Sequence, residues 1–333
     1  MDTFRKLRNN IIIGFAVIVC MAIAVGFIVD RQRLAEVIKT ANPMYIIPAI
    51  IFALLSYLCL SYNFYIFCRV FGIKAHKTDL LKVGYVSTVV NNIISAGGAA
   101  QYYFRILIMK QWNEAISNIF AASFFQIYMN MLALMILLLI GIFRITLTHQ
   151  INSSLNTGLV SIATLLLVTL VVFTLVFFFS QVRHFILSRI SGILKVVIKK
   201  DFNQHFNKLE QAIGRGVAVF KEKPSMLITQ FIILIMDWGS AILCLYFCLR
   251  AFSLSLPIEV LVTGFTAGQA AGFLSLTPGG VGIQDGSMAG IFTLFGISLE
   301  KVLFGSLLYR IIYYFLPALV SLLFFKGLFK KEQ

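Results

Sequence analysis

The feature that most constrains this chain is a series of apolar runs, each near the roughly 20 residues that a helix needs to cross a bilayer. Six runs are long enough to cross: residues 11–29, 45–68, 117–141, 158–180, 226–249 and 301–325. Charged residues make up only 12% of the 333 residues, about half their usual share in soluble domains. Lipid offers no hydrogen-bond partners to backbone N–H and C=O groups, so a segment that crosses the bilayer must pair them internally, as a helix does. The sequence therefore predicts an all-α polytopic membrane protein, with 1–333 as a single membrane domain.

The first run is interpreted as a retained helix and not as a cleaved signal peptide. It ends at Asp30-Arg31-Gln32-Arg33, which offers no small-x-small cleavage site.

Two further apolar stretches are interrupted by glycine. One covers 80–109 and is broken between Asn91 and Gly98, and the other covers 258–295 and is broken between Thr277 and Gly282. Each has a flank too short to cross alone. Such breaks are typical of re-entrant or discontinuous helices, because irregular backbone at membrane depth must be buried or line a cavity. We therefore expect about six full crossings and two re-entrant hairpins.

Charge gives the expected orientation. The connection 181–224 carries nine Lys and Arg residues, whereas 142–157 carries only Arg144. The positive-inside rule places the first in the cytoplasm and the second outside. If both hairpins return to the side from which they enter, both termini are cytoplasmic in a multi-pass protein of the cell membrane.

This topology contains an inverted repeat, with residues 1–141 as the first unit and 158–325 as the second. Three short matches align in order, at offsets of 181, 180 and 182 residues: Arg69-x-Phe71 with Arg250-x-Phe252, Leu81-x-x-Gly84 with Leu261-x-x-Gly264, and Ser95-x-Gly97-Gly98 with Thr277-x-Gly279-Gly280. The alternative is that membrane sequences have simple compositions and align easily.

The basic connection 181–224 has an amphipathic pattern. Apolar residues between 183 and 200 recur at helical spacing and basic residues fill the positions around them. That pattern predicts a helix lying on the anionic inner leaflet. The net charge of +15 is then mainly a topology signal, and no nucleic-acid partner is expected.

Strongly polar residues inside apolar segments are costly and usually functional. Arg310 lies deep in the last run, and a buried guanidinium needs an anion. Asp285 is the expected protein partner and Asp237 is the alternative. Asp237 and Gln126 are candidates for a gating or charge-partner role.

The glycine breaks supply a second ingredient of a binding site. A pair of glycines leaves backbone N–H groups accessible at the start of the following half-helix, and these groups attract phosphate. Arginine can hold phosphate with two hydrogen bonds. The candidate headgroup-binding residues are Asn91, Asn92, Gly97, Gly98, Arg105, Gly279, Gly280, Gln284, Asp285 and Arg310. The structural alternative is tight glycine packing, with Arg105 at the inner membrane interface.

Catalysis has little support in the sequence. There is no HExxH motif, serine elbow, Walker loop or CxxC pair, and Cys244 and Cys248 have no ligand-type neighbours at suitable spacing. We expect no cofactor, no metal and no catalytic residue.

The two glycine segments resemble known signatures. Thr277-Pro278-Gly279-Gly280-Val281-Gly282-Ile283-Gln284-Asp285, followed by Tyr309-Arg310, is similar to the C-terminal signature of the lysylphosphatidylglycerol synthase transmembrane-region family. Asn91, Gly97-Gly98 and Arg105 resemble its N-terminal signature. The usual glutamate is Asp285 here. Gln126 and Asn130 stand near the place of an acidic-arginine pair that is common in the family.

The resemblance implies a function. The family includes the flippase half of the multiple peptide resistance factor, so the expected role is translocation or binding of an anionic lipid, such as a phospholipid or a polyprenyl-phosphate-linked lipid. Two alternatives stay open: a membrane enzyme acting on a lipid phosphate, and a scaffold for a lipid-modifying enzyme. Homo-oligomerisation is also left open.

Overall fold

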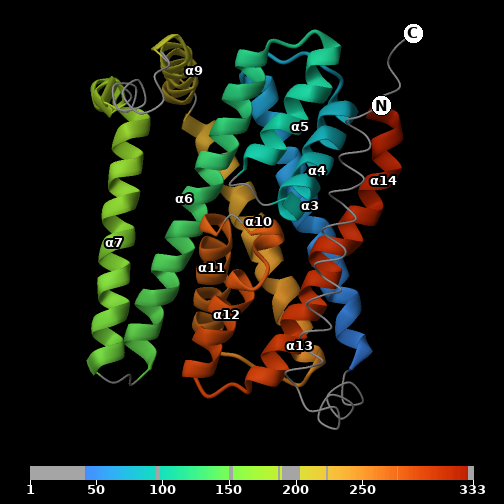
Figure 1. Ribbon diagram of the computed structural model, residues 1–333, viewed down its shortest axis with the longest axis vertical. Helices are drawn as coiled ribbons and strands as arrows, with labels where there is room; N and C mark the ends of the chain where they lie inside the picture. Colours follow the sequence, from blue (N-terminus) through green and yellow to red (C-terminus); the bar gives the residue numbers. More distant parts are fainter. Residues whose placement is uncertain are drawn as a thin grey trace.

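The computed structural model describes residues 42–94, 98–149, 153–186, 188–189, 203–222, 224–275 and 277–328. Within these ranges the regular structure is helical and contains no strand (Figure 1). The prediction of an all-α polytopic membrane protein is thereby confirmed. The predicted run 11–29 lies outside the described residues.

Five described segments are long and apolar enough to cross a membrane, and each matches a predicted run. They are Pro43–Val70, Ile116–Thr148, Asn156–Phe178, Pro224–Ala251 and Leu299–Phe324. The corresponding elements are η1 (Pro43–Tyr45) with α3 (Ile46–Val70), α6 (Ile116–Thr148), α7 (Ser153–Phe178), α10 (Pro224–Ala251), and the series α13 (Leu299–Arg310), η4 (Ile311–Phe315) and α14 (Leu316–Leu328).

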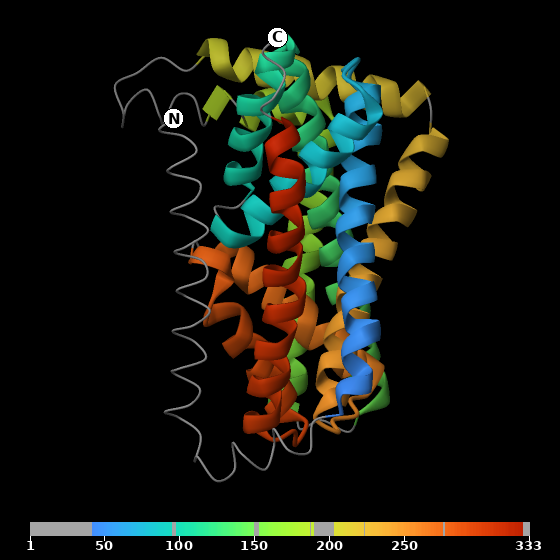
Figure 2. The same cartoon turned by 90° about the vertical axis from the view of Figure 1, so that its right-hand side faces the viewer.

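The glycine-broken stretches form two helical hairpins. The first consists of α4 (Lys77–Ile94) and α5 (Ala99–Met109), which is followed by η2 (Lys110–Trp112). The second consists of α11 (Ile258–Leu274), η3 (Pro278–Gly280) and α12 (Ile283–Leu294). The first hairpin occupies the upper half of the bundle and the second the lower half (Figures 1 and 2). Their tips meet: a Cβ atom on Gly279 would lie 3.4 Å from the backbone oxygen of Asn92.

The second hairpin is held together by a glycine stripe. Gly264, Gly268 and Gly272 recur every four residues along α11 and face α12. A Cβ on Gly268 would lie 2.8 Å from the backbone oxygen of Gln284. Small residues at this spacing let two helix backbones approach closely, as in other membrane helix pairs.

The long helices α3 and α10 pack against each other along their length. They run in opposite directions, α3 upward and α10 downward in the view of Figure 2. Both are rich in buried side chains along their contact. Since each span is largely apolar, packing and a few buried hydrogen bonds hold the pair together.

The periphery contains two different helices. α7 packs against α6 and α9, and most of its large apolar side chains are exposed, as expected for a helix facing lipid. α9 (Asn203–Glu222) lies across the upper end of the bundle (Figures 1 and 2). Its buried residues Ile213, Val217 and Phe220 share one helix face. Most of the amphipathic helix predicted at 183–200 lies outside the described residues.

The last span contains a short π-helix, η4, directly after Arg310. Such insertions widen one turn of a helix and often occur at functional sites. Tyr313 and Tyr314 lie in this turn and are buried. Beyond it, α14 packs on α4, where the rings of Phe324 and Tyr85 meet edge to face with centroids 5.4 Å apart.

Candidate functional site

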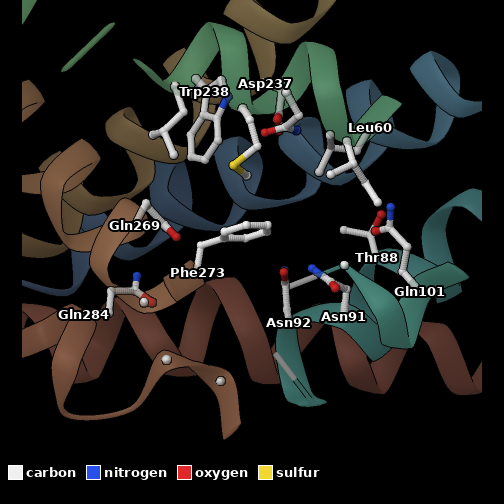
Figure 3. A pocket seen from close by; sticks show the side chains of 18 of the residues that line it. Leu60, Thr88, Asn91, Asn92, Gln101, Asp237, Trp238, Gln269, Phe273 and Gln284 are labelled. Carbon is white, nitrogen blue, oxygen red and sulfur yellow. The ribbon is translucent and has the colours of Figure 1, made fainter. Parts of the chain in front are cut away.

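A cavity of about 130 Å³ lies where the two hairpin tips meet α3, α6, α10 and η4. At about 30 Å³ per water molecule, its volume corresponds to about four waters, or to a polar group of similar size. Seven side-chain amides line it, those of Asn91, Asn92, Gln101, Gln126, Asn130, Gln269 and Gln284. Figure 3 shows Asn91 and Asn92 on one side of the cavity, with Gln269 and Phe273 on the other. The walls therefore offer many hydrogen bonds within an apolar bundle.

The first hairpin contributes polar groups from both of its helices. Asn91 and Asn92 end α4, and Asn92 Nδ2 donates to Tyr57 Oη at 2.7 Å. Gly98 caps α5 with φ +87°, and a Cβ there would lie 2.8 Å from Ile127. Gln101, in the first turn of α5, is only 8% exposed and lines the cavity. Gly97 lies outside the described residues.

Arg105 lies behind this wall and is completely buried. Its Nε donates to Ser87 Oγ at 2.9 Å and Nη2 donates to Gln126 Oε1 at 2.7 Å. The guanidinium stacks on Phe64, 3.7 Å from the ring centroid, and Nη1 has no partner. No carboxylate in the described residues pairs with it. Arg105 is therefore enclosed by protein on all sides.

Arg310 has the opposite environment. Its Nη2 lies 2.7 Å from Asp285 Oδ2 and its Nε lies 2.9 Å from both carboxylate oxygens. Nη1 donates to the carbonyl of Gly279 at 2.8 Å, and Nη2 also lies 3.4 Å from the carbonyl of Gly280. The predicted pairing with Asp285 is confirmed. In this conformation Arg310 fastens the second glycine loop, and its nitrogens already have acceptors.

Asp285 is well placed to hold Arg310. It lies in the first turn of α12, where its Oδ2 accepts the backbone N–H of Gly282 at 3.2 Å. Ser306 donates to its Oδ1 at 2.5 Å. A carboxylate at a helix N-terminus is favoured by the helix dipole. Nearby, Gln284 Oε1 accepts from Tyr314 Oη at 3.0 Å, so the amide, the ion pair and the π-helix form one network.

Asp237 is separate from this ion pair, so its alternative assignment as the partner of Arg310 is wrong. It is 3% exposed, lies midway along α10 and lines the cavity. Ser56 Oγ donates to its Oδ1 at 2.5 Å and is itself 2.7 Å from Tyr313 Oη. Tyr57 Oη donates to the carbonyl of Tyr313 at 2.9 Å. These contacts join α3, α10 and η4.

The family described as the lysylphosphatidylglycerol synthase TM region matches residues 11–321. The chain belongs to this family.

Two relatives show how far the likeness extends. A UPF0104 membrane protein of Methanothermobacter thermautotrophicus is 21% identical over 296 residues, which cover 86% of this chain and 85% of that protein. The phosphatidylglycerol lysyltransferase of Staphylococcus aureus strain MRSA252 is 33% identical over 87 residues. That match covers 26% of this chain and only 10% of the lysyltransferase. Membership of the lysylphosphatidylglycerol synthase TM family thus supports a multi-pass membrane protein related to a lipid-modifying one.

Most of the predicted site residues converge on one place in this family member. The two asparagines, Gly98, Gln126, Asp237, Gly279, Gly280 and Gln284 all line the cavity, while Arg105, Asp285 and Arg310 lie directly behind its walls. The sequence did not single out Ser56, Tyr57, Gln101, Tyr313 and Tyr314. The predicted repeat could have pointed to Ser56, because Ser56 precedes Asp237 by 181 residues, an offset that also relates the repeat matches.

Proposed function

We propose that the protein binds an anionic membrane lipid with its headgroup in the central cavity, and that it moves this headgroup between the two leaflets. The observation that carries the proposal is Arg105, a fully buried guanidinium with no acidic partner in the described residues. A charge in such surroundings acts over a longer range than in water. It therefore favours an anion in the adjacent amide-lined cavity, acting through Gln126.

The first hairpin offers further support for an anion. The N-terminus of α5 opens at Gly98 beside the cavity without a side-chain cap, and exposed N–H groups at a helix start attract phosphate. Gln101 in that first turn is buried, lines the cavity and adds a donor. The second hairpin has its arginine neutralised by Asp285. We therefore expect phosphate to bind on the side of the first hairpin.

An inverted repeat with two re-entrant hairpins belongs to this proposal. It is supported by the opposite placement of the hairpins in Figure 1 and by the antiparallel pair α3 and α10 in Figure 2. Ser56 and Asp237, separated by 181 residues, hydrogen-bond to each other. Two equivalent residues in contact are expected at a two-fold axis relating the halves. Rocking of the halves about that axis would expose the cavity to each side in turn.

The proposal is tested with Arg105→Gln in reconstituted vesicles. We expect phosphatidylglycerol to bind at least about tenfold more weakly, which corresponds to the loss of one charge-assisted interaction. Translocation of a fluorescent phosphatidylglycerol should slow in parallel. Arg105→Lys, which keeps the charge, should retain a larger share of both.

Thermal unfolding in detergent is the control. Because Arg105 is buried without an acid, its replacement should leave stability unchanged or raised. Equal phosphatidylglycerol binding by the wild type and Arg105→Gln would contradict the proposal. So would equal binding of phosphatidylcholine, because a site for an anionic headgroup should discriminate against it.

A membrane enzyme acting on a lipid phosphate is the main alternative. It would need Asp237 or Asp285 as a nucleophile or general acid. Asp285 is already held by Arg310, Ser306 and the Gly282 amide, which argues against a catalytic role for it. We therefore propose binding and transport in preference to catalysis.

A further inference from the structure

Asp237 is a buried carboxylate whose charge the transport proposal does not use. It is 3% exposed and lies near the middle of a 28-residue span. Asp285, the other carboxylate of comparable burial in the described residues, has Arg310 at 2.7 Å. Among the described residues, Asp237 has only the hydroxyl of Ser56, at 2.5 Å. A carboxylate at membrane depth without a cation is costly when charged and marks ion or proton pathways.

In the part of the chain that the structure describes, the groups facing Asp237 do not supply the missing positive charge. The titratable ones are Cys59 and Tyr57 on α3 and Tyr313 on η4, and each is neutral or anionic in its two forms. The neighbouring polar side chains of the cavity are amides. The nearest way to relieve the cost of burial is therefore to bind a proton.

A short hydrogen-bonded chain connects Asp237 with the cavity. Tyr313 lines the cavity, its Oη lies 2.7 Å from Ser56 Oγ, and Ser56 Oγ lies 2.5 Å from Asp237 Oδ1. Each hydroxyl can accept one proton and release another. Asp237 itself also lines the cavity, so water there has access to the carboxylate.

We propose that Asp237 is a proton-binding site, and that it takes up a proton when an anion occupies the cavity. In this step a hydronium ion in the cavity transfers a proton to the carboxylate: one O–H bond of the hydronium breaks, one O–H bond forms on Asp237, and a water molecule is left behind. The proton-binding part of the proposal rests on the geometry of Asp237 alone. The coupling to the anion rests on the proposed function, since it needs an anionic headgroup in the same cavity.

The coupling follows from charge. A negative carboxylate in the cavity wall repels an incoming phosphate, whereas the protonated form does not. By linkage, anion binding then promotes proton uptake. Affinity for the anionic lipid should be constant at low pH and fall by up to tenfold per pH unit once Asp237 loses its proton.

The first experiment does not need a ligand. Infrared difference spectra of the purified protein are recorded over a pH series, and the carbonyl stretch of a protonated carboxylic acid is followed. We expect a titrating band that is absent in Asp237→Asn and unchanged in Glu222→Gln, an exposed acid at the end of α9. The asparagine keeps the shape and can still accept from Ser56. If that variant does not fold, Ser56→Ala should shift the band, because it removes the hydrogen bond. A band that persists in Asp237→Asn, or one that responds to Na⁺ and not to pH, overturns the proposal.

The second experiment measures phosphatidylglycerol binding across the same pH series. The wild type should lose affinity as pH rises, and Asp237→Asn should bind with an affinity independent of pH. Binding without pH dependence in the wild type overturns the coupling but leaves the lipid site intact. An absence of phosphatidylglycerol binding at every pH contradicts the proposed function instead, while the infrared band still decides whether Asp237 binds a proton.

Discussion

The two buried arginines behind the cavity walls have contrasting environments. Arg310 has Asp285 and the carbonyls of two glycines, so its charge is compensated within the protein. Arg105 has a serine, an amide and a phenyl ring. The same type of side chain is therefore used in two ways: Arg310 fixes a loop, whereas the charge of Arg105 has no acidic partner in the described residues.

The ion pair leads to a prediction about stability. Arg310→Gln leaves Asp285 buried without a cation, which should cost about 3–5 kcal/mol. Adding Asp285→Asn removes the stranded charge, so the double variant should be more stable than Arg310→Gln alone. A double-mutant cycle on unfolding in detergent measures this coupling. Additive effects of the two substitutions would show that the contact contributes nothing.

The partner of each charge was the hardest thing to predict from the sequence. Arg310 and Asp285 are only 25 residues apart, and the position of Asp285 just after the second glycine break suggested the pairing. Apart from the 181-residue offset that points to Ser56, the surroundings of Asp237 could not be predicted in this way, because Ser56 and Tyr313 come from distant segments. Serine and tyrosine are common in membrane helices and do not stand out by composition.

At the scale of elements, the second hairpin depends on its glycine stripe. Gly268→Ala would push a methyl group against the backbone of Gln284, which cannot move aside easily. We expect a loss of about 1–3 kcal/mol from overpacking. Gly290→Ala on α12 is the matched control, because nothing lies within 4 Å of the added methyl. Alanine is the better helix former there, so that variant should be as stable as the wild type.

Thermal unfolding of the two glycine variants, side by side, is the measurement. Equal stability of Gly268→Ala and Gly290→Ala would mean that α11 and α12 do not pack through this stripe.

Hydropathy located the spans and glycine located the breaks, because both are local properties. The stripe itself was overlooked, although its four-residue spacing is visible in the sequence.

For the whole molecule, the two ends of the bundle should face opposite sides of the membrane. Asn113 lies in the loop after the first hairpin and Ser255 in the loop before the second, and both are exposed. The four described cysteines are buried, so they should react slowly. By the positive-inside rule, a membrane-impermeant thiol reagent should reach Asn113→Cys only from the cytoplasmic side and Ser255→Cys only from outside.

Labelling of both positions from one side would exclude the arrangement in which the hairpins enter from opposite faces. Labelling from the reverse sides would keep the hairpins but invert the chain. The unsubstituted protein gives the background, including any reaction at Cys20.

The charge pattern is a property of the whole chain, which is why orientation could be predicted before any contact was known.

The π-helix in the last span has a consequence for how that span can vary. Each residue turns an α-helix by about 100°, so removing one residue between Ile311 and Phe315 would leave the hydropathy and length of the span almost unchanged. The helix after the deletion would nevertheless rotate about its axis. Phe324 would then lose its contact with the ring of Tyr85, whereas Arg310 would keep its ion pair with Asp285. The span thus consists of two helices whose contact faces are rotated relative to each other: α13 packs on the second hairpin and α14 on the first.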